Sequence, residues 1–165
     1  MAAPCTVANA GRIWLTLMSK ISCSDSLGLL MLYCSTGTVD AYDVTSRVHE
    51  AIVPLRYNRV REAGRMKEAL GILEEAGETL QRVGGNDPHD LARYHSAESM
   101  LMAATFTLRA ALMREESRAQ HFREDFPDRD DKNWFKWINI EQGDGGPRLS
   151  TMPVPVASYR LQPER

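Results

Sequence analysis

Clustered carboxylates in the last third of the chain are the first residues whose chemistry stands out. Asp125, Asp128, Asp130 and Asp131 lie close together, and carboxylate oxygens are the ligands that calcium and magnesium prefer. A calcium loop of the EF-hand type also needs glycine at its sixth position and glutamate at its twelfth, and neither falls in register here. Helix capping and ion pairing are therefore the favoured roles of these carboxylates. Their basic neighbours in the sequence are Arg123, Arg129 and Lys132.

A second candidate for metal chemistry is the pair of His95 and Glu98, three positions apart on one face of a predicted helix. Di-metal helical bundles use a glutamate followed by a histidine at this spacing, together with a second such motif and further carboxylates. Here the order is reversed and the rest of the motif is missing. The pair is better interpreted as two solvated side chains on a helix surface.

Other common site motifs are not found. The cysteines Cys5, Cys23 and Cys34 are odd in number and spaced by 18 and 11 residues, which fits neither a disulfide framework nor a zinc site. Reduced thiols in a cytoplasmic protein are the better interpretation. The glycine clusters, at residues 84–85 and 143–146, do not follow a predicted strand and open a helix, so no dinucleotide-binding fingerprint is present. A Walker loop and a nucleophile elbow are also missing from the sequence.

The densest group of ionisable and aromatic side chains is the run from Arg114 to Trp134, REESRAQHFREDFPDRDDKNW. The guanidinium groups of Arg118 and Arg123 suit carboxylate partners or backbone carbonyls. Two interpretations of the run stay open, and both can hold. Its charged and aromatic residues form an interface to another domain, or they fasten the segment that follows to the preceding helix.

This run closely resembles the C-terminal helical domain of the fumarate reductase and succinate dehydrogenase flavoprotein family, which also includes L-aspartate oxidase and adenylylsulfate reductase. The family pattern is E-S-R-G-x-H-x-R-x-D-[FY]-P-x-x-D-D-x-x-W, at the end of a long helix. The residues that match it in register are Glu116, Ser117, Arg118, His121, Arg123, Asp125, Phe126, Pro127, Asp130, Asp131 and Trp134. The resemblance extends over roughly 110 residues and is strong over the last half of them.

The chain departs from the family pattern at two positions. Ala119 stands where the family has glycine, which is a mild change if the helix extends by one more residue. Trp137 stands where the respiratory members tend to have histidine. No particular substrate class within the family is therefore assigned.

The resemblance implies a role beside a flavin-dependent enzyme. In the family, an FAD-binding domain and a mobile capping domain carry out catalysis, and this chain has no room for them. We expect a C-terminal accessory domain that docks on an absent flavin domain or subunit and is inactive alone. The alternative is a stand-alone helical interaction module without redox activity, so enzymatic activity is left open. FAD belongs to the parent family, and we expect this chain alone to bind no cofactor.

No residue is assigned a catalytic, cofactor-binding or metal-binding role. The candidate interface to the flavin domain consists of the motif residues Glu116, Ser117, Arg118, His121, Arg123, Asp125, Asp130, Asp131 and Trp134. We expect no nucleic-acid partner and no direct membrane insertion. The expected location is the cytoplasm, with membrane association only through a partner complex.

Hydrophobic periodicity predicts the elements that position these residues. A first helix begins near Asp43, with Val44, Val48, Ile52 and Leu55 on its apolar face, and Pro54 kinks or ends it. A second helix covers residues 58–83 and stops at Gly84-Gly85. A third runs from Pro88, after an Asp87 cap, to about His121.

Residues 135–141 and 147–154 flank a glycine-rich turn and predict a β-hairpin. The predicted fold class is therefore mainly α, an antiparallel three-helix bundle of the spectrin-repeat type followed by a small C-terminal β-hairpin.

The distribution of charge divides the chain into unequal parts. The net charge is −2 and the pI is near 6.1, which removes the usual electrostatic basis for non-specific binding to nucleic acid. Only Arg12, Lys20 and Asp25 are charged within residues 1–38. We expect residues 1–42 to be an apolar leader, residues 43–154 to be the helical domain with its hairpin, and residues 155–165 to be a loose tail. Lys20 and Asp25 interrupt the leader too early for a membrane-spanning helix of about 20 apolar residues.

Overall fold

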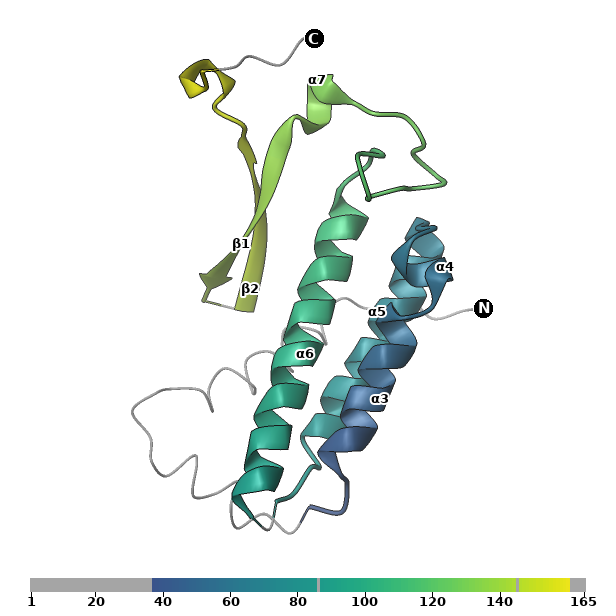
Figure 1. The fold of residues 1–165 in the computed structure, drawn as a ribbon, viewed down its shortest axis with the longest axis vertical. Helices are drawn as coiled ribbons and strands as arrows, with labels where there is room; N and C mark the ends of the chain where they lie inside the picture. Colours follow the sequence, from purple (N-terminus) through teal and green to yellow (C-terminus); the bar gives the residue numbers. More distant parts are fainter. Residues whose placement is uncertain (1–36, 86, 145, 161–165) are drawn as a thin grey trace.

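Three long helices and one hairpin make up the part of the chain that the computed structural model describes, residues 37–85, 87–144 and 146–160. The helices α3 (Ala41–Ile52), α5 (Ala63–Leu80) and α6 (Pro88–Met113) run up, down and up beside one another (Figure 1). The hairpin of β1 (Lys136–Gly143) and β2 (Gly146–Pro153) follows them. The predicted fold class is confirmed. The predicted leader lies mostly outside the described residues.

Helix α3 begins where Asp40 caps it, because the Asp40 carboxylate accepts a hydrogen bond from the Tyr42 backbone N–H at 2.9 Å. It ends at Ile52, two residues before Pro54, whose ring cannot continue the hydrogen-bond ladder. The prediction that Leu55 continues the apolar face is wrong. Leu55 opens the short helix α4 (Leu55–Asn58) and is 69% exposed.

The second predicted helix, residues 58–83, is interrupted near its start. The chain between α4 and α5 instead pairs with a distant segment. The Arg61 N–H donates to the Phe122 carbonyl at 3.3 Å, and the Glu124 N–H donates to the Arg61 carbonyl at 2.8 Å. These bonds between distant segments of the chain replace the hydrogen bonds that a continuous α-helix would have made. Helix α5 therefore begins only at Ala63.

Helix α6 has the expected beginning but a different end. Its Asp87 cap accepts from the N–H groups of His89 and Asp90, and Pro88 takes the first helical position. The helix stops at Met113 rather than near His121, because Arg114 turns to extended backbone. The predicted extension to His121 is therefore wrong, and the motif residues from Glu116 onward lie outside the helix.

The core lies between the three long helices. Most of its buried members are small or aliphatic, which lets the helices pack closely, and Tyr57 and Tyr94 are its aromatic members. The buried members include Val44 and Val48, as the periodicity predicted, together with Met66, Leu73, Ala76, Leu80, Ala97, Leu101, Ala104 and Leu108. Thr105 is the buried polar member of α6, and its hydroxyl donates to the Leu101 carbonyl at 2.8 Å.

The hairpin follows the short helix α7 (Asp131–Trp134) and pairs antiparallel with Gly143 opposite Gly146. Gly146 has a φ of 111°, a conformation that side-chain-bearing residues rarely adopt. A 3-10 turn (Val156–Ser158) falls within the segment expected to be a tail.

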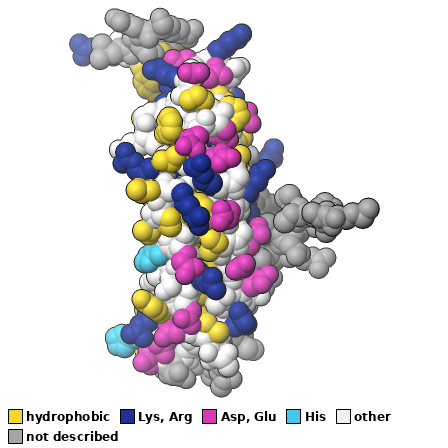
Figure 2. Space-filling view, turned by 90° about the vertical axis from the view of Figure 1, so that its right-hand side faces the viewer, with side chains coloured by type: hydrophobic (Ala, Val, Ile, Leu, Met, Phe, Trp, Pro, Cys, Tyr) yellow, Lys and Arg dark blue, Asp and Glu magenta, His cyan; other side chains and the backbone are white. Residues whose placement is uncertain are grey.

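The outer face of the bundle over α3 and α5 carries basic and acidic side chains interspersed with each other (Figure 2). Among the described residues, none of the helices combines the length and apolar character that crossing a membrane requires.

Candidate functional site

The family-like motif folds into an irregular segment, residues 114–135, which we name the clamp. It leaves the C-terminal end of α6 and lies at the same end of the bundle as α4 (Figure 1). It contacts the α4–α5 connection on one side and leads into the hairpin on the other. The candidate interface residues predicted from the sequence all lie in this segment.

Glu116 is the centre of the clamp and is 0% exposed. Its carboxylate accepts from Arg118 Nε at 2.8 Å, from Arg118 Nη2 at 2.9 Å and from Arg114 Nη1. It also accepts from the Asp130 backbone N–H at 2.9 Å. Burial alone would raise the pKa of Glu116, but these donors outweigh it and hold the pKa below its usual value. The carboxylate is therefore charged, and its hydrogen bonds join both ends of the clamp.

Arg123 is the second buried charge, with 1% exposure. Its guanidinium forms a bidentate pair with the Asp125 carboxylate. On its other side, Nη1 donates to the carbonyls of Leu112 at 2.9 Å and Arg114 at 3.0 Å. Carbonyls at a helix C-terminus lack partners within the helix, so Arg123 supplies the donor that ends α6 here.

Asp125 connects this pair to the next helix. Its Oδ2 accepts from the Ala63 backbone N–H, the first residue of α5, at 3.1 Å. Hydrogen bonds from Arg123 lower the pKa of Asp125 to about 2. One carboxylate thus joins the guanidinium that ends α6 to the amide that begins α5.

Ser117 and Asp130 set the backbone course of the clamp. The Ser117 hydroxyl donates to the Phe126 carbonyl at 2.8 Å and accepts from the Arg123 N–H at 2.8 Å. The Asp130 carboxylate caps α7 by accepting from the Asn133 N–H at 3.0 Å. The sequence-based interpretation of clustered aspartates as capping and ion-pairing groups holds for Asp125, Asp130 and Asp131.

The start of the hairpin is tied to the end of α6 by Arg114. Its Nη1 donates to the Trp134 carbonyl at 3.1 Å and its Nη2 donates to the Lys136 carbonyl at 2.7 Å. The Trp134 ring lies near both cations, 5.4 Å from the Arg114 guanidinium and 4.9 Å from Lys136 Nζ. These bonds are those expected of a segment that fastens the hairpin to the bundle.

Ala119 lies in a tight turn between Arg118 and His121, which exchange backbone hydrogen bonds of 2.8 and 2.9 Å. It has a φ of 52°, the left-handed region that favours glycine. The expectation that the helix extends through this position is wrong, and the turn explains why glycine suits the family pattern here.

Replacing Ala119 with glycine is expected to raise the free energy of unfolding by about 0.5–1 kcal/mol. Left-handed backbone costs a non-glycine residue roughly 1–2 kcal/mol, and glycine's greater freedom in the unfolded chain offsets part of the gain. Urea denaturation measures the change. Ala103→Gly, on the exposed face of α6, is the control and should lose about 1 kcal/mol. A destabilised Ala119→Gly variant would contradict the left-handed turn.

His121 is half-buried and lies beside Arg61 of the α4–α5 connection, with 2.9 Å between its Nδ1 and Arg61 Nη1. A guanidinium only donates, so Nδ1 accepts and the imidazole is neutral. Burial lowers the pKa of His121, and the nearby charges of Arg61, Arg114 and Arg123 lower it further. Neither Arg61 nor Arg114 was predicted as a site residue. Arg61 is separated from the motif by some 60 positions, so no local spacing could reveal it.

The lowered pKa of His121 predicts a loss of stability in mild acid. Unfolded chains take up a proton near pH 6.5 and the folded chain does so only at lower pH, so the free energy of unfolding falls as pH drops below about 6.5. The slope approaches at most about 1.4 kcal/mol per pH unit. Urea denaturation at several pH values between about 7.5 and 5 should show this slope in the free energy of unfolding. The range brackets the unfolded pKa of about 6.5. His121→Gln should lack the slope, whereas His95→Gln should keep it.

The outward side of the clamp carries aromatic and charged side chains. Phe122 is 44% exposed, and Phe126 is also exposed. Arg118 extends from Glu116 to Asp131, which in turn pairs with Arg129 at 2.7 Å. Of the predicted interface residues, Glu116 and Arg123 are thus buried inside the clamp and bonded within it, while Asp131 lies at its surface.

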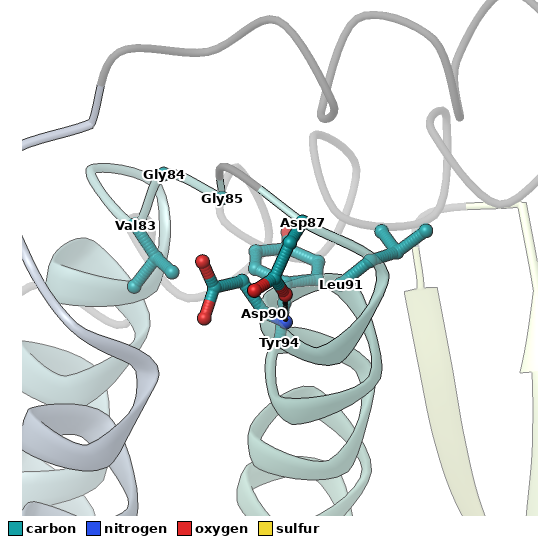
Figure 3. Close-up of a pocket in the computed structure, with 7 residues that line it drawn as sticks. All are labelled: Val83, Gly84, Gly85, Asp87, Asp90, Leu91 and Tyr94. Carbon is teal, nitrogen blue, oxygen red and sulfur yellow. Dashed lines mark hydrogen bonds between the residues drawn. The ribbon is translucent and has the colours of Figure 1, made fainter.

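The other end of α6 holds a small hollow of about 10 Å³ (Figure 3). Asp87 and Asp90 line it, but the Asp87 carboxylate is occupied by the cap of α6. His95 and Glu98 contact each other at 3.2 Å on the helix surface. Among the described residues, no group of three or more His, Cys, Asp or Glu side chains is placed to hold a metal ion.

Comparison with known proteins identifies the family to which this architecture belongs. Residues 53–165 match the family model described as the fumarate reductase flavoprotein C-terminus. The chain belongs to this family. The matched range includes the whole clamp and hairpin, so the family is shown by the segment whose geometry is described above.

Curated relatives include the fumarate reductase flavoprotein subunit of Helicobacter pylori, 32% identical over 139 residues. That match covers 78% of this chain and 19% of the relative, so the chain spans about a fifth of that subunit's length. The succinate dehydrogenase flavoprotein subunit of Rickettsia conorii is 33% identical over 76 residues, covering 43% of this chain and 13% of the relative.

Solved structures share the fold. A quinol fumarate reductase from E. coli has a TM-score of 0.73 at 21% identity, covering 100% of this chain and 28% of that chain. Adenylylsulfate reductase from Archaeoglobus fulgidus has a TM-score of 0.66 at 15% identity, covering 91% and 24%. The described part of this chain therefore shares its fold with parts of these two enzymes.

Proposed function

We propose that this chain serves as the C-terminal accessory domain of an FAD-dependent oxidoreductase of the fumarate reductase and succinate dehydrogenase type. It docks on the flavin-binding part of that enzyme and has no redox activity by itself. In this proposal the domain reaches a membrane only through a partner complex. The two curated relatives named above, of which this chain matches 19% and 13% of the length, support the assignment.

The two-sided construction of the clamp is the observation that carries the proposal. Inside, Glu116 and Arg123 are buried and fully engaged, which gives a fixed shape to a segment whose only regular element is the short helix α7. Outside, Phe122 and Phe126 are exposed beside charged groups. An aromatic centre with a charged rim on a rigid base is the usual composition of a protein interface.

Phe122 is the best placed anchor. Its carbonyl accepts from the Arg61 N–H at 3.3 Å, so its backbone is held by the α4–α5 connection. Its side chain projects with 44% exposure. Because the backbone is already ordered, binding through this ring costs little additional conformational entropy.

The described residues do not fit a flavin site. FAD-binding domains of this kind hold the pyrophosphate on a glycine-rich turn between a strand and a helix. The paired glycines here lie between α5 and α6 and in the hairpin turn, not between a strand and a helix. The clamp arginines Arg118 and Arg123 are engaged with Glu116, Asp125 and Asp131. The flavin chemistry is therefore assigned to the docking partner.

Calorimetric titration with the flavin-bearing part of the Helicobacter pylori subunit, made without its own C-terminal portion, tests docking. We expect a one-to-one complex. Phe122→Asp should weaken it at least tenfold, about 1.4 kcal/mol, because it places a carboxylate in an apolar contact.

Tyr42→Asp is the matched control, since it also replaces an exposed aromatic side chain with aspartate. Tyr42 is 72% exposed and lies on α3, away from the clamp. It should leave the affinity within about twofold, as a surface change outside the contact does. Equal losses in both variants, or no association of the parent chain, would favour the stand-alone interaction module.

A further inference from the structure

The two edges of the hairpin can be assigned from its hydrogen bonds. In antiparallel sheets, residues alternate between pairs that bond each other and pairs that turn their N–H and C=O outward. Here the Val154 N–H donates to the Phe135 carbonyl, so the odd-numbered residues of β1 bond inward. The even-numbered residues face outward, as the bond from Arg114 Nη2 to the Lys136 carbonyl confirms.

The outer edge of β2 is closed to further pairing. Its outward positions are the partners of the even-numbered β1 residues, and both ends of that row are proline, Pro147 and Pro153. Proline has no N–H to donate and is a common means of blocking an edge strand. A further strand therefore cannot pair along the length of β2.

The outer edge of β1 is open. Ile138, Ile140 and Gln142 present backbone donors and acceptors there, with no partner among the described residues. None of the described residues of the hairpin is fully buried, and Ile140 is 37% exposed. A two-stranded hairpin alone is marginally stable in water, so an additional strand on β1 would be stabilising.

We propose that two copies of this chain pair antiparallel through their β1 edges, about a two-fold axis at Ile140. This register places Ile140 opposite its own copy and Ile138 opposite Gln142 of the second copy. The bonded groups of Ile138, Ile140 and Gln142 are then the ones that have no partner among the described residues of the single chain. The result is a four-stranded sheet whose outer edges are both the proline-blocked β2.

Charge complementarity favours this register over its neighbours. It brings Lys136, at the start of β1, to the position facing Asp144 of the second copy, the turn residue that directly follows β1, once at each end of the paired segment. No like charges face each other within the strands. Moving the axis to Asn139 would instead set Lys136 opposite Gln142. That pairing loses both charge pairs. It also gives Gln142 the partner Lys136, whose carbonyl already accepts from Arg114, whereas the axis at Ile140 gives Gln142 the partner Ile138.

Sedimentation equilibrium of the purified chain over a range of concentrations tests the proposal. We expect a concentration-dependent dimer whose dissociation constant rises at least about tenfold in Ile140→Pro. Ile140 faces outward, so this proline removes an edge donor without removing a bond between β1 and β2. Thr151→Pro makes the same change on the closed edge and should leave the dimer intact.

Ile140→Lys gives a second, conformationally mild variant, because it sets two like charges against each other at the two-fold axis. It should also weaken the dimer while leaving the far-ultraviolet circular dichroism unchanged. A monomer at every concentration overturns the proposal, and so does a dimer that Ile140→Pro and Thr151→Pro weaken equally or that Ile140→Lys leaves unchanged. The outcome is independent of the docking at Phe122, which involves a different surface and a different measurement.

Discussion

Replacing Glu116 with glutamine is expected to lower the free energy of unfolding by about 3 kcal/mol, because breaking a buried ion pair leaves its partners charged and without compensation. Arg114 and Arg118 both lose their shared carboxylate, and the new amide brings further donors against them. Urea denaturation followed by circular dichroism measures the change.

Glu115→Gln is the matched control, since Glu115 is the exposed neighbour of Glu116. This substitution should change the free energy of unfolding by less than about 0.5 kcal/mol. Trp134 gives a local readout in the same samples. Its ring lies near Arg114 and Lys136, so its fluorescence should change in the Glu116 variant before the bundle unfolds. Equal stability of the two variants would show that the clamp is not organised around Glu116.

Replacing Arg123 with methionine is expected to lower the free energy of unfolding by about 4 kcal/mol. Methionine fills much of the same space but leaves the Asp125 carboxylate and the last carbonyls of α6 without their donor. Hydrogen exchange should also become faster at the C-terminal turn of α6, because the cap that ends the helix is gone.

Arg129→Met provides the comparison for this change. Arg129 pairs only with the exposed Asp131 side chain among the ion pairs of the described residues, and such surface pairs contribute roughly 0–1 kcal/mol. A loss of the same size in both variants would contradict the distinction between the inside and the outside of the clamp.

Periodicity was sufficient to predict the bundle because each long helix buries one stripe. The stripes of Val44 and Val48, Leu73 and Leu80, and Leu101 and Leu108 are all in the core. The helix starts at Asp40 and Asp87 follow from local capping chemistry, although only Asp87 was predicted. The hairpin was predicted to within two residues, since a glycine-rich turn separates its two short segments.

The end of α6 could not be predicted in this way. Residues 114–121 contain no proline or glycine, so no local helix breaker marks the end. The helix stops because Arg123, nine residues beyond Arg114, binds its last carbonyls. Likewise, α5 begins late because Arg61 pairs with Phe122 and Glu124. Tertiary hydrogen bonds decide both helix boundaries, and the helix propensities of the neighbouring residues cannot reveal such bonds.

The clamp itself was predicted in composition but not in connectivity. The resemblance to the family located eleven residues of the segment, from Glu116 to Trp134, but not Arg114, and the charge pattern indicated ion pairs. Which arginine meets which carboxylate depends on a left-handed residue at Ala119 that local sequence did not reveal. The burial of Glu116 and Arg123 likewise follows from the folded path of the backbone.

Flavin retention tests docking on a flavin-binding partner most directly. Residues 37–165 would replace the equivalent C-terminal portion of the Helicobacter pylori flavoprotein subunit, and the ratio of FAD to protein would be measured after gel filtration. Docking predicts a ratio near that of the intact subunit, and well above that of the subunit lacking its C-terminal portion. A chimera that retains no more FAD than the truncated subunit would contradict it.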